Sequence, residues 1–169
     1  MSDVTTSNDQ DRQWRVRQPG REDFQRWRAL YRGYADFYGV QQSEEMAALV
    51  WSWIHDPDNE VACLLVEDER RLVVGLAHYR PFARPLSAST GCYLDDLFID
   101  PAQRGGGAAD ALLAELATLA GEKGWSVIRW ITADDNYRGR AKYDRYATRT
   151  TWITYDRPPT AESPGLPHE

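Results

Sequence analysis

The chain has 169 residues, 42% of them hydrophobic and 27% charged, and its formal net charge is −6. This length suits one domain with a sizeable core. The acidic balance argues against a nucleic-acid-binding surface, which needs a clustered basic face. No apolar run approaches the roughly 18 residues of a membrane span, so no membrane partner is expected.

The cysteines and histidines predict neither a disulfide framework nor a metal site. Cys63 and Cys92 lie in strand-like stretches without framework spacing, which predicts free thiols, a reducing compartment and a cytoplasmic protein. The three histidines are far apart and lack metal-ligand spacing. The polar ends, residues 1–11 and 158–169, predict disordered tails around one domain at residues 12–157.

Hydrophobic periodicity predicts the elements of the first half of the chain. Trp14 and Val16 alternate with polar neighbours as in a strand, and aromatic residues then recur at helical steps up to Tyr38. Ser43 is a suitable N-cap for a second helix, which Asp56-Pro57 ends. The predicted elements are a strand at 12–17, a helix at 21–38, a helix from Ser43, antiparallel strands at 61–67 and 72–79, and a proline-containing loop at 80–90.

The chain is organised around a strand, a glycine-rich turn and a helix. The segment Cys92–Ile99 is apolar and aromatic around one acidic pair, which predicts a buried strand. Asp100-Pro101 ends this strand because proline lacks the N–H that a central strand donates. The next segment, Gln103–Ala109, contains three consecutive glycines and is here called the glycine loop. Leucines recur at helical spacing from Ala109 onward.

A helix that begins within the glycine loop presents unpaired N–H groups and a partial positive charge at its N-terminus. With few Cβ atoms around them, these donors can approach a pyrophosphate closely. A P-loop would need Lys-Ser or Lys-Thr where Ala108-Ala109 stands, and a dinucleotide fingerprint would need a glycine at Asp110. The alternative is a turn that only packs a helix against a sheet.

Three further elements are predicted after the glycine-loop helix. Gly124 suits the C-terminal end of that helix. The apolar run Val127–Thr132 predicts the fifth long strand. A short helix at Tyr137–Tyr146 and a last strand at Thr151–Tyr155 complete the order.

The pattern Arg104-x-x-Gly107-x-Ala109, placed after a strand and a proline, resembles the acetyl-CoA-binding motif of the GCN5-related N-acetyltransferases (GNAT). The order of predicted elements over residues 12–157 resembles the fold of the same family. The resemblance implies an α/β GNAT fold with a mixed, mostly antiparallel central sheet, helices on both faces, and a splayed strand pair that holds acetyl-CoA. It also implies direct attack of an amine on the acetyl thioester in a ternary complex.

In this family, the organising strand and the glycine loop bind acetyl-CoA. By this resemblance, the CoA-binding residues are Leu97, Phe98, Ile99, Gln103, Arg104, Gly105, Gly106, Gly107, Ala108, Ala109 and Asn136. The position of Gly106 departs from the pattern, because relatives often carry a basic side chain there. We therefore expect one phosphate-facing charge fewer.

The family also places a tyrosine near the CoA sulfur, seven residues after an asparagine. Asn136 and Tyr143 have this spacing, so the resemblance implies that Tyr143 is the general acid for the leaving thiolate. The usual Gly-Phe continuation is replaced by Tyr146-Ala147-Thr148. Tyr146 therefore stays an alternative donor, and a purely structural role stays open for either tyrosine.

The segment Tyr93–Phe98 resembles the acidic strand of spermidine/spermine acetyltransferases, in which a carboxylate binds or deprotonates the acceptor. Successive strand residues point to opposite faces, so without a bulge only one of Asp95 and Asp96 reaches the acceptor. The motif favours Asp95, and leaves Asp96 a structural hydrogen bond or ion pair. With Glu44 and Glu45 near the entrance, the expected acceptor is a small di- or polyamine or a lysine-type amine.

Three classes of function remain. The first is an acetyl-CoA-dependent N-acetyltransferase acting on a primary amine. The second keeps the fold and the CoA site but acts as a catalytically weak or inactive sensor or partner protein. The third, a phosphate-binding enzyme of another fold, is disfavoured by the missing P-loop lysine. Relatives often dimerise through late strands, which implies a homodimer, whereas the residues themselves leave the oligomeric state open.

Overall fold

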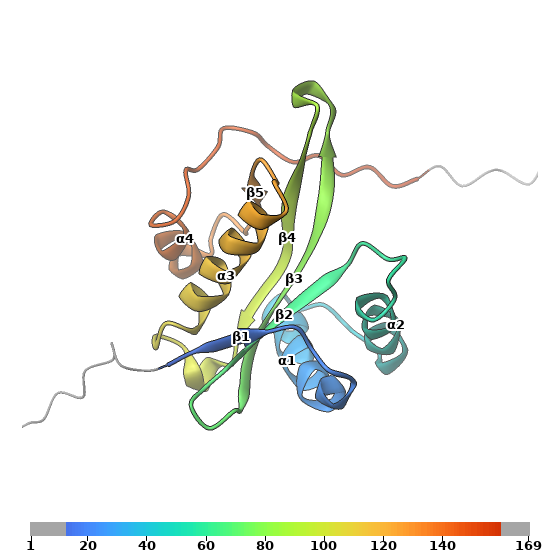
Figure 1. Ribbon diagram of the computed structural model, residues 1–169, viewed down its shortest axis with the longest axis vertical. Helices are drawn as coiled ribbons and strands as arrows, with labels where there is room; N and C mark the ends of the chain where they lie inside the picture. The colour runs from blue at the N-terminus through green and yellow to red at the C-terminus, as the bar shows by residue number, and fades with distance from the viewer. Residues whose placement is uncertain (1–12, 160–169) are drawn as a thin grey trace, which may run out of the picture. The chain divides into compact units, whose positions relative to one another are not determined.

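The computed structural model describes residues 13–159. Five strands form one sheet in the order β1-β2-β3-β4-β5, antiparallel except for the parallel pair β4 and β5 (Figure 1). The strands are β1 (Arg15–Arg17), β2 (Ala62–Glu67), β3 (Val73–Arg84), β4 (Ser89–Ile99) and β5 (Ile128–Arg129), and the α-helices are α1 (Phe24–Phe37), α2 (Glu44–Ile54), α3 (Ala108–Glu122) and α4 (Tyr137–Tyr143). This confirms the predicted α/β architecture with a mixed, mostly antiparallel sheet.

The chain divides into two compact units, one that ends at Ile131 and one that begins at Thr132. The first holds the whole sheet with α1, α2 and α3, and the second holds α4. The predicted single domain at 12–157 stays a prediction. The predicted N-terminal tail, 1–11, lies outside the described residues, as does most of the C-terminal one.

Two apolar cores lie on opposite faces of the sheet, as the alternation of strand residues requires. Leu64 and Val66 of β2 pack on the face covered by α3, together with Leu112 and Leu116. Leu65, between them in sequence, packs on the other face, in a cluster that includes residues of α1 and α2. Figure 1 shows the same arrangement, with α3 on one side of the sheet and α1 and α2 on the other.

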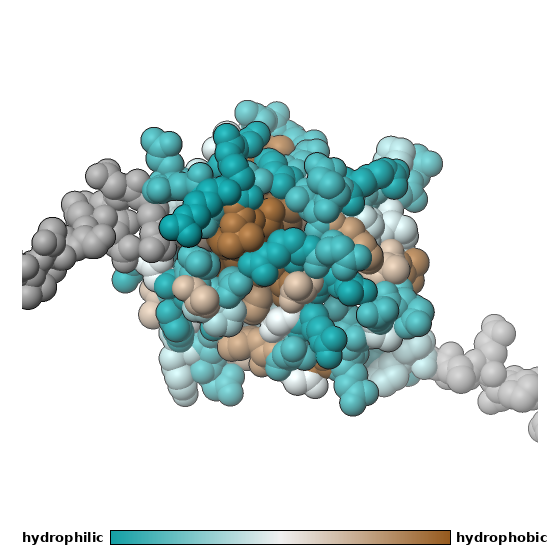
Figure 2. All heavy atoms as spheres, turned by 90° about the horizontal axis from the view of Figure 1, so that it is seen from below, coloured by the Kyte–Doolittle hydropathy of each residue, from teal (hydrophilic) through white to brown (hydrophobic). Residues whose placement is uncertain are grey.

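Some apolar side chains lie outside these cores. One face of the molecule is mainly hydrophilic and has a group of apolar atoms near its centre (Figure 2). Large apolar side chains that are exposed on α1, α2 and the segment between them are Phe37, Tyr38, Val40, Met46, Leu49 and Trp53. The layer formed by α1 and α2 therefore exposes more large apolar side chains to solvent than the strands of the sheet do.

The predicted loop at 80–90 is wrong, because β3 and β4 continue through it as one long hairpin. Their pairing runs to Arg84 opposite Ser89, with a short 3-10 turn between them. Pro81 is tolerated because β2 ends opposite Tyr79, so no strand lies beside Pro81 to receive the N–H it lacks. The proline that suggested a loop is therefore compatible with a central strand at this one place.

Other element boundaries also differ from prediction. The strand predicted at 127–132 pairs only at Ile128–Arg129, and the short helix ends at Tyr143 instead of Tyr146. The last strand predicted at 151–155 is wrong, because these residues are exposed and no described residue pairs with them as a strand. A strand exists only where a neighbour accepts its hydrogen bonds, which the residue pattern alone does not reveal.

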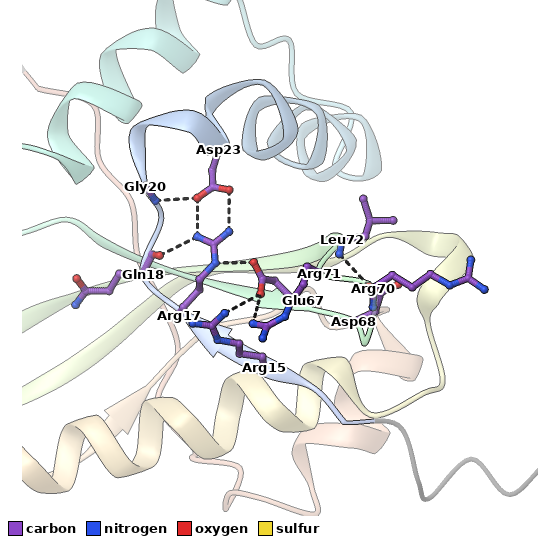
Figure 3. Close-up of polar contacts among 10 residues, drawn as sticks. All are labelled: Arg15, Arg17, Gln18, Gly20, Asp23, Glu67, Asp68, Arg70, Arg71 and Leu72. Atoms are coloured by element: carbon purple, nitrogen blue, oxygen red, sulfur yellow. Dashed lines mark hydrogen bonds and ion pairs between the residues drawn. The ribbon is translucent and has the colours of Figure 1, made fainter.

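The N-terminal strand is fixed to the sheet and to the start of α1 by an ionic network (Figure 3). The Arg17 guanidinium donates two hydrogen bonds to the carboxylate of Asp23, at 2.6 and 2.8 Å, and its Nε donates to Glu67 at 2.6 Å. Glu67 also faces Arg15 and Arg71 at 3.7 Å. The hydrogen bonds to Arg17 hold the pKa of Asp23 below its usual value of 3.8, although burial opposes this.

Replacing Asp23 with asparagine should destabilise the fold by about 1.5–3 kcal/mol, the usual contribution of a hydrogen bond to a charged group. Because folding lowers the pKa of Asp23, its contribution is complete above the unfolded-state pKa and is lost as the pH falls through the lower folded-state value. Denaturant unfolding from about pH 6 to pH 2 should therefore show that the free energy of unfolding falls less steeply with acid in Asp23→Asn than in wild type. Parallel declines for the two proteins would contradict this role.

Candidate active site

Strand β4 carries one extra residue relative to β3. Leu94 lies opposite Tyr79 and Asp96 lies opposite His78, so Asp95 has no partner in the pairing. This β-bulge cancels the normal alternation of faces. Asp95 contacts Arg80, and Asp96 contacts His78, two residues away on the same face of β3. Both carboxylates therefore lie on the face that α1 and α2 cover.

Asp95 is held in an ion pair. The Nε of Arg80 lies 3.3 and 3.2 Å from the two oxygens of Asp95, and the guanidinium also stacks on the ring of Tyr93. Burial raises the pKa of Asp95 above its usual value, whereas the charge of Arg80 acts in the opposite direction. The residue predicted to bind the acceptor thus already faces one cation.

Asp96 ends a chain of three hydrogen-bonded side chains. Its Oδ2 lies 2.8 Å from Nδ1 of His78, and Nε2 of the same ring lies 2.9 Å from Nε1 of Trp27. His78 and Trp27 are almost wholly buried, at 1% and 0% exposure. The predicted structural hydrogen bond of Asp96 is present. The sequence pattern does not reveal His78 and Trp27 as its partners, because only the bulge brings His78 opposite Asp96.

Tyr31 of α1 forms the wall beside this acidic pair. Its ring contacts the His78 ring edge-on at 4.8 Å between centroids. Burial raises the pKa of Tyr31 to about 12, and the nearby charges of Asp96 and Asp95 act in the same direction. The hydroxyl therefore stays protonated at neutral pH. The aromatic residues of α1 thus serve both core packing and the wall of this site.

The glycine loop leads directly into α3. The helix starts at Ala108, within the glycine loop as predicted, and Gly107 is its N-cap with φ of +91°. Nε1 of Trp14 donates to the carbonyl of Gly106 at 2.5 Å, so the residue directly before β1 holds the loop in place. A Cβ on Gly107 would lie 3.2 Å from the same Trp14 atom. Backbone conformation and close packing therefore both favour glycine at 107.

Arg104 lies against aromatic rings near the end of β4. Its Nε donates to the carbonyl of Ile99 at 3.1 Å, and its guanidinium stacks on Phe98 and Phe37. Phe98 belongs to the α1/α2 core. Contacts within the protein therefore hold the guanidinium of Arg104, which is predicted to face a phosphate, at this end of the loop.

Among residues 13–159, no strand pairs with β4 beyond Tyr93 on the edge that faces β5, and this stretch is here called the open edge of β4. Its pairing with β5 is limited to Cys92 with Ile128 and Tyr93 with Arg129, although β4 continues to Ile99. The side chains of Leu97, Phe98 and Ile99 pack into the two cores. What this edge would offer a ligand is therefore backbone N–H and C=O groups, and the binding of CoA by these three residues stays a prediction.

In the second unit, Asn136 caps α4. Its side-chain oxygen accepts from the N–H of Gly139 at 3.1 Å, and its amide nitrogen donates to Thr132 at 3.0 Å. Tyr143 is the last residue of α4, and the N–H of Tyr146 donates to its carbonyl. The spacing of Asn136 and Tyr143, which suggested a catalytic motif, therefore runs from the N-cap to the last residue of one short helix.

Within residues 13–159, no three His, Cys, Asp or Glu side chains are grouped closely enough to bind a metal ion. Across the same residues, every helix is too short or too polar to cross a bilayer.

Residues 27–147 match the acetyltransferase (GNAT) family. The D-amino-acid N-acetyltransferase HPA3 of Saccharomyces cerevisiae is 24% identical over 137 residues, which cover 80% of this chain and 85% of that protein. A probable acetyltransferase of known crystal structure superposes with a TM-score of 0.76 at 22% identity, covering 88% of this chain and 99% of that one. The aminoglycoside N-acetyltransferase AAC(6')-Iy, solved with CoA, gives 0.75 at 16% identity, covering 87% and 95%.

The chain belongs to the GNAT acetyltransferase family. It is an acetyltransferase, and the acyl donor of the family is acetyl-CoA. The similarity to spermidine/spermine acetyltransferases stays a prediction.

The residues of the first unit fit CoA in two respects. The glycine loop runs into the N-terminus of a 15-residue helix, where the N–H groups of the first turn have no partner within the helix. The open edge of β4 provides backbone groups beyond Tyr93. A diphosphate at the loop and an extended amide chain along the strand edge would match these two features.

Gly107 and Gly105 offer a matched test of the loop. Both have a positive φ, +91° and +95°, so alanine at either should cost roughly 1–2 kcal/mol of stability. A Cβ at 105 meets no protein atom within 4 Å, whereas one at 107 pushes on Trp14. We expect Gly107→Ala to be the less stable of the two variants in thermal unfolding. Calorimetric titration should also show that Gly107→Ala binds CoA more weakly than wild type. CoA affinity equal to wild type in both folded variants would exclude this loop as the diphosphate site.

Proposed function

We propose that this protein transfers the acetyl group of acetyl-CoA to the primary amine of a small molecule, with di- and polyamines and lysine-type amines as the first candidates. The observation that supports this most is the bulge in β4, which brings Asp95 and Asp96 to one face beside Tyr31. Carboxylates in a partly buried site favour an ammonium group through charge-assisted hydrogen bonds.

The reaction requires three things of the protein. The amine must lose a proton, because a free alkylammonium has a pKa near 10.4. The developing oxyanion needs N–H donors, which the open edge of β4 would supply. The departing thiolate benefits from a proton donor. We assign this last role to Tyr143, with Tyr146 as the alternative.

A second candidate is an amine that also carries a carboxylate, such as an amino acid. Arg80 stacks on Tyr93, and Arg129 stacks on Phe82, whose ring contacts Tyr93 at 5.9 Å. Arg80 puts positive charge beside the acidic pair, and Arg129 adds a second positive charge to the neighbouring aromatic group, which suits a zwitterion. The similarity to a D-amino-acid N-acetyltransferase supports the same candidate.

Release of the CoA thiol should be measured against diamines, polyamines, lysine, D- and L-amino acids, aminoglycosides and peptide N-termini. Activity on diamines that falls with added salt would support the first candidate, because salt screens attraction of a cation. Activity confined to amino acids would support the second. Acetyl-CoA binding without thiol release over the whole panel would favour a catalytically weak sensor or partner protein.

Replacing Tyr143 with phenylalanine should lower turnover roughly tenfold or more, as loss of a general acid does, and should leave CoA affinity nearly unchanged. The matched control is Tyr146→Phe, which removes the same hydroxyl three residues later. Turnover should be followed by thiol release, and CoA binding by calorimetry. A large loss in Tyr146→Phe with little effect in Tyr143→Phe would transfer the role to Tyr146.

A further inference from the structure

The two carboxylates at the bulge differ in the net charge that each has together with its bonded partner. Asp95 is paired with the guanidinium of Arg80, so the pair together carries no net charge. Asp96 is bonded to His78, whose own charge depends on its protonation. The state of His78 therefore decides which carboxylate attracts a cation.

Hydrogen-bond geometry fixes the proton of His78. The indole Nε1–H of Trp27 only donates, so Nε2 of His78, 2.9 Å away, is the unprotonated acceptor. The single ring proton is then on Nδ1, which donates to Oδ2 of Asp96 at 2.8 Å. His78 is thus neutral, and the carboxylate of Asp96 keeps its full negative charge.

The environment of Asp96 leaves one oxygen for a ligand. Its side chain is 20% exposed, and Oδ1 has no hydrogen bond to any residue between 13 and 159. The charged and titratable groups around it are Arg80 and His78 on β3, Asp95 on β4, Tyr31 on α1 and Cys63 on β2. Arg80 is the one cation among them, and Asp95 is its partner.

We propose that Asp96, rather than Asp95, binds the ammonium group of the acceptor, and that Trp27 and His78 are positioning residues that hold its carboxylate in place. This inference rests on the proposed function and names the residue that recognises the amine. Asp96 acts as a counter-ion. The proton that the ammonium must lose passes to solvent water, since a carboxylate that stabilises the cation is a poor base for it.

The kinetic test compares Asp96→Asn with Asp95→Asn, using pentane-1,5-diamine and lysine as acceptors. In Asp96→Asn the amide oxygen can still accept from His78, so this variant removes charge with little change of shape. Asp96→Asn should raise the KM for both amines tenfold or more, with CoA affinity within about twofold of wild type. Asp95→Asn leaves the guanidinium of Arg80 without its partner, and should raise KM by a clearly smaller factor than Asp96→Asn. An equal or larger effect of Asp95→Asn would overturn the inference.

The positioning role has its own matched pair. In His78→Asn, the amide nitrogen lies near the former Nδ1 and still donates to Asp96, whereas in His78→Gln the amide reaches toward Trp27 instead. His78→Asn should keep a KM near that of wild type, and His78→Gln should show a raised KM. Equal KM values in two folded variants would remove His78 from the positioning role.

Nuclear magnetic resonance gives a readout that does not need turnover. Long-range ¹⁵N correlation of the imidazole rings should show His78, assigned by its loss in His78→Gln, as the neutral Nδ1–H form. Pentane-1,5-diamine should shift this signal in wild type and in Asp95→Asn, but not in Asp96→Asn. An Nε2–H form, an imidazolium, or a diamine-induced shift that persists in Asp96→Asn would overturn the inference. Failure of wild type to acetylate any amine would instead remove the proposed function, and these spectra would still judge the binding role of Asp96.

Discussion

The pairing of β3 with β4 is the constraint on which the rest of the site depends. One extra residue in β4 shifts the register between Leu94 and Asp96, so two adjacent carboxylates point to the same face. Leu94 and Ile99, on either side of the bulge, still pack against α3. The bulge therefore places a polar pair on one face of the strand without breaking the core on the other.

The acidic pair is balanced by partners from other parts of the chain. Arg80 neutralises Asp95, while a neutral His78, fixed by Trp27, leaves the charge of Asp96 in place. A buried histidine with both nitrogens bonded needs a donor on one side and an acceptor on the other. Helix α1 supplies the donor, and β4 supplies the acceptor. The layer that forms the α1/α2 core thus also orients a side chain of the site.

The features predicted to bind CoA depend equally on distant residues. Trp14 bonds to the carbonyl of Gly106 across 92 residues of sequence, and the network around Arg17 fixes the same strand to β2 and to the start of α1. Strand β5 stops pairing after Tyr93 and leaves the edge of β4 open. The glycine loop is short of side chains, so its shape comes from these neighbours and from its own positive φ angles.

The sequence by itself determined the order of the elements from β1 to α4, the family and the glycine loop, because each depends on local spacing: leucines at helical steps, a proline after a strand, three glycines before a helix. The tertiary structure decided the length of the β3–β4 hairpin, the absence of a strand at 151–155 and the partners of Asp95 and Asp96. These depend on which strand lies beside which residue. A bulge of one residue reverses the face of a side chain, and no periodicity in β4 alone reveals it. Trp27 and His78, 51 residues apart, meet only when α1 covers the sheet.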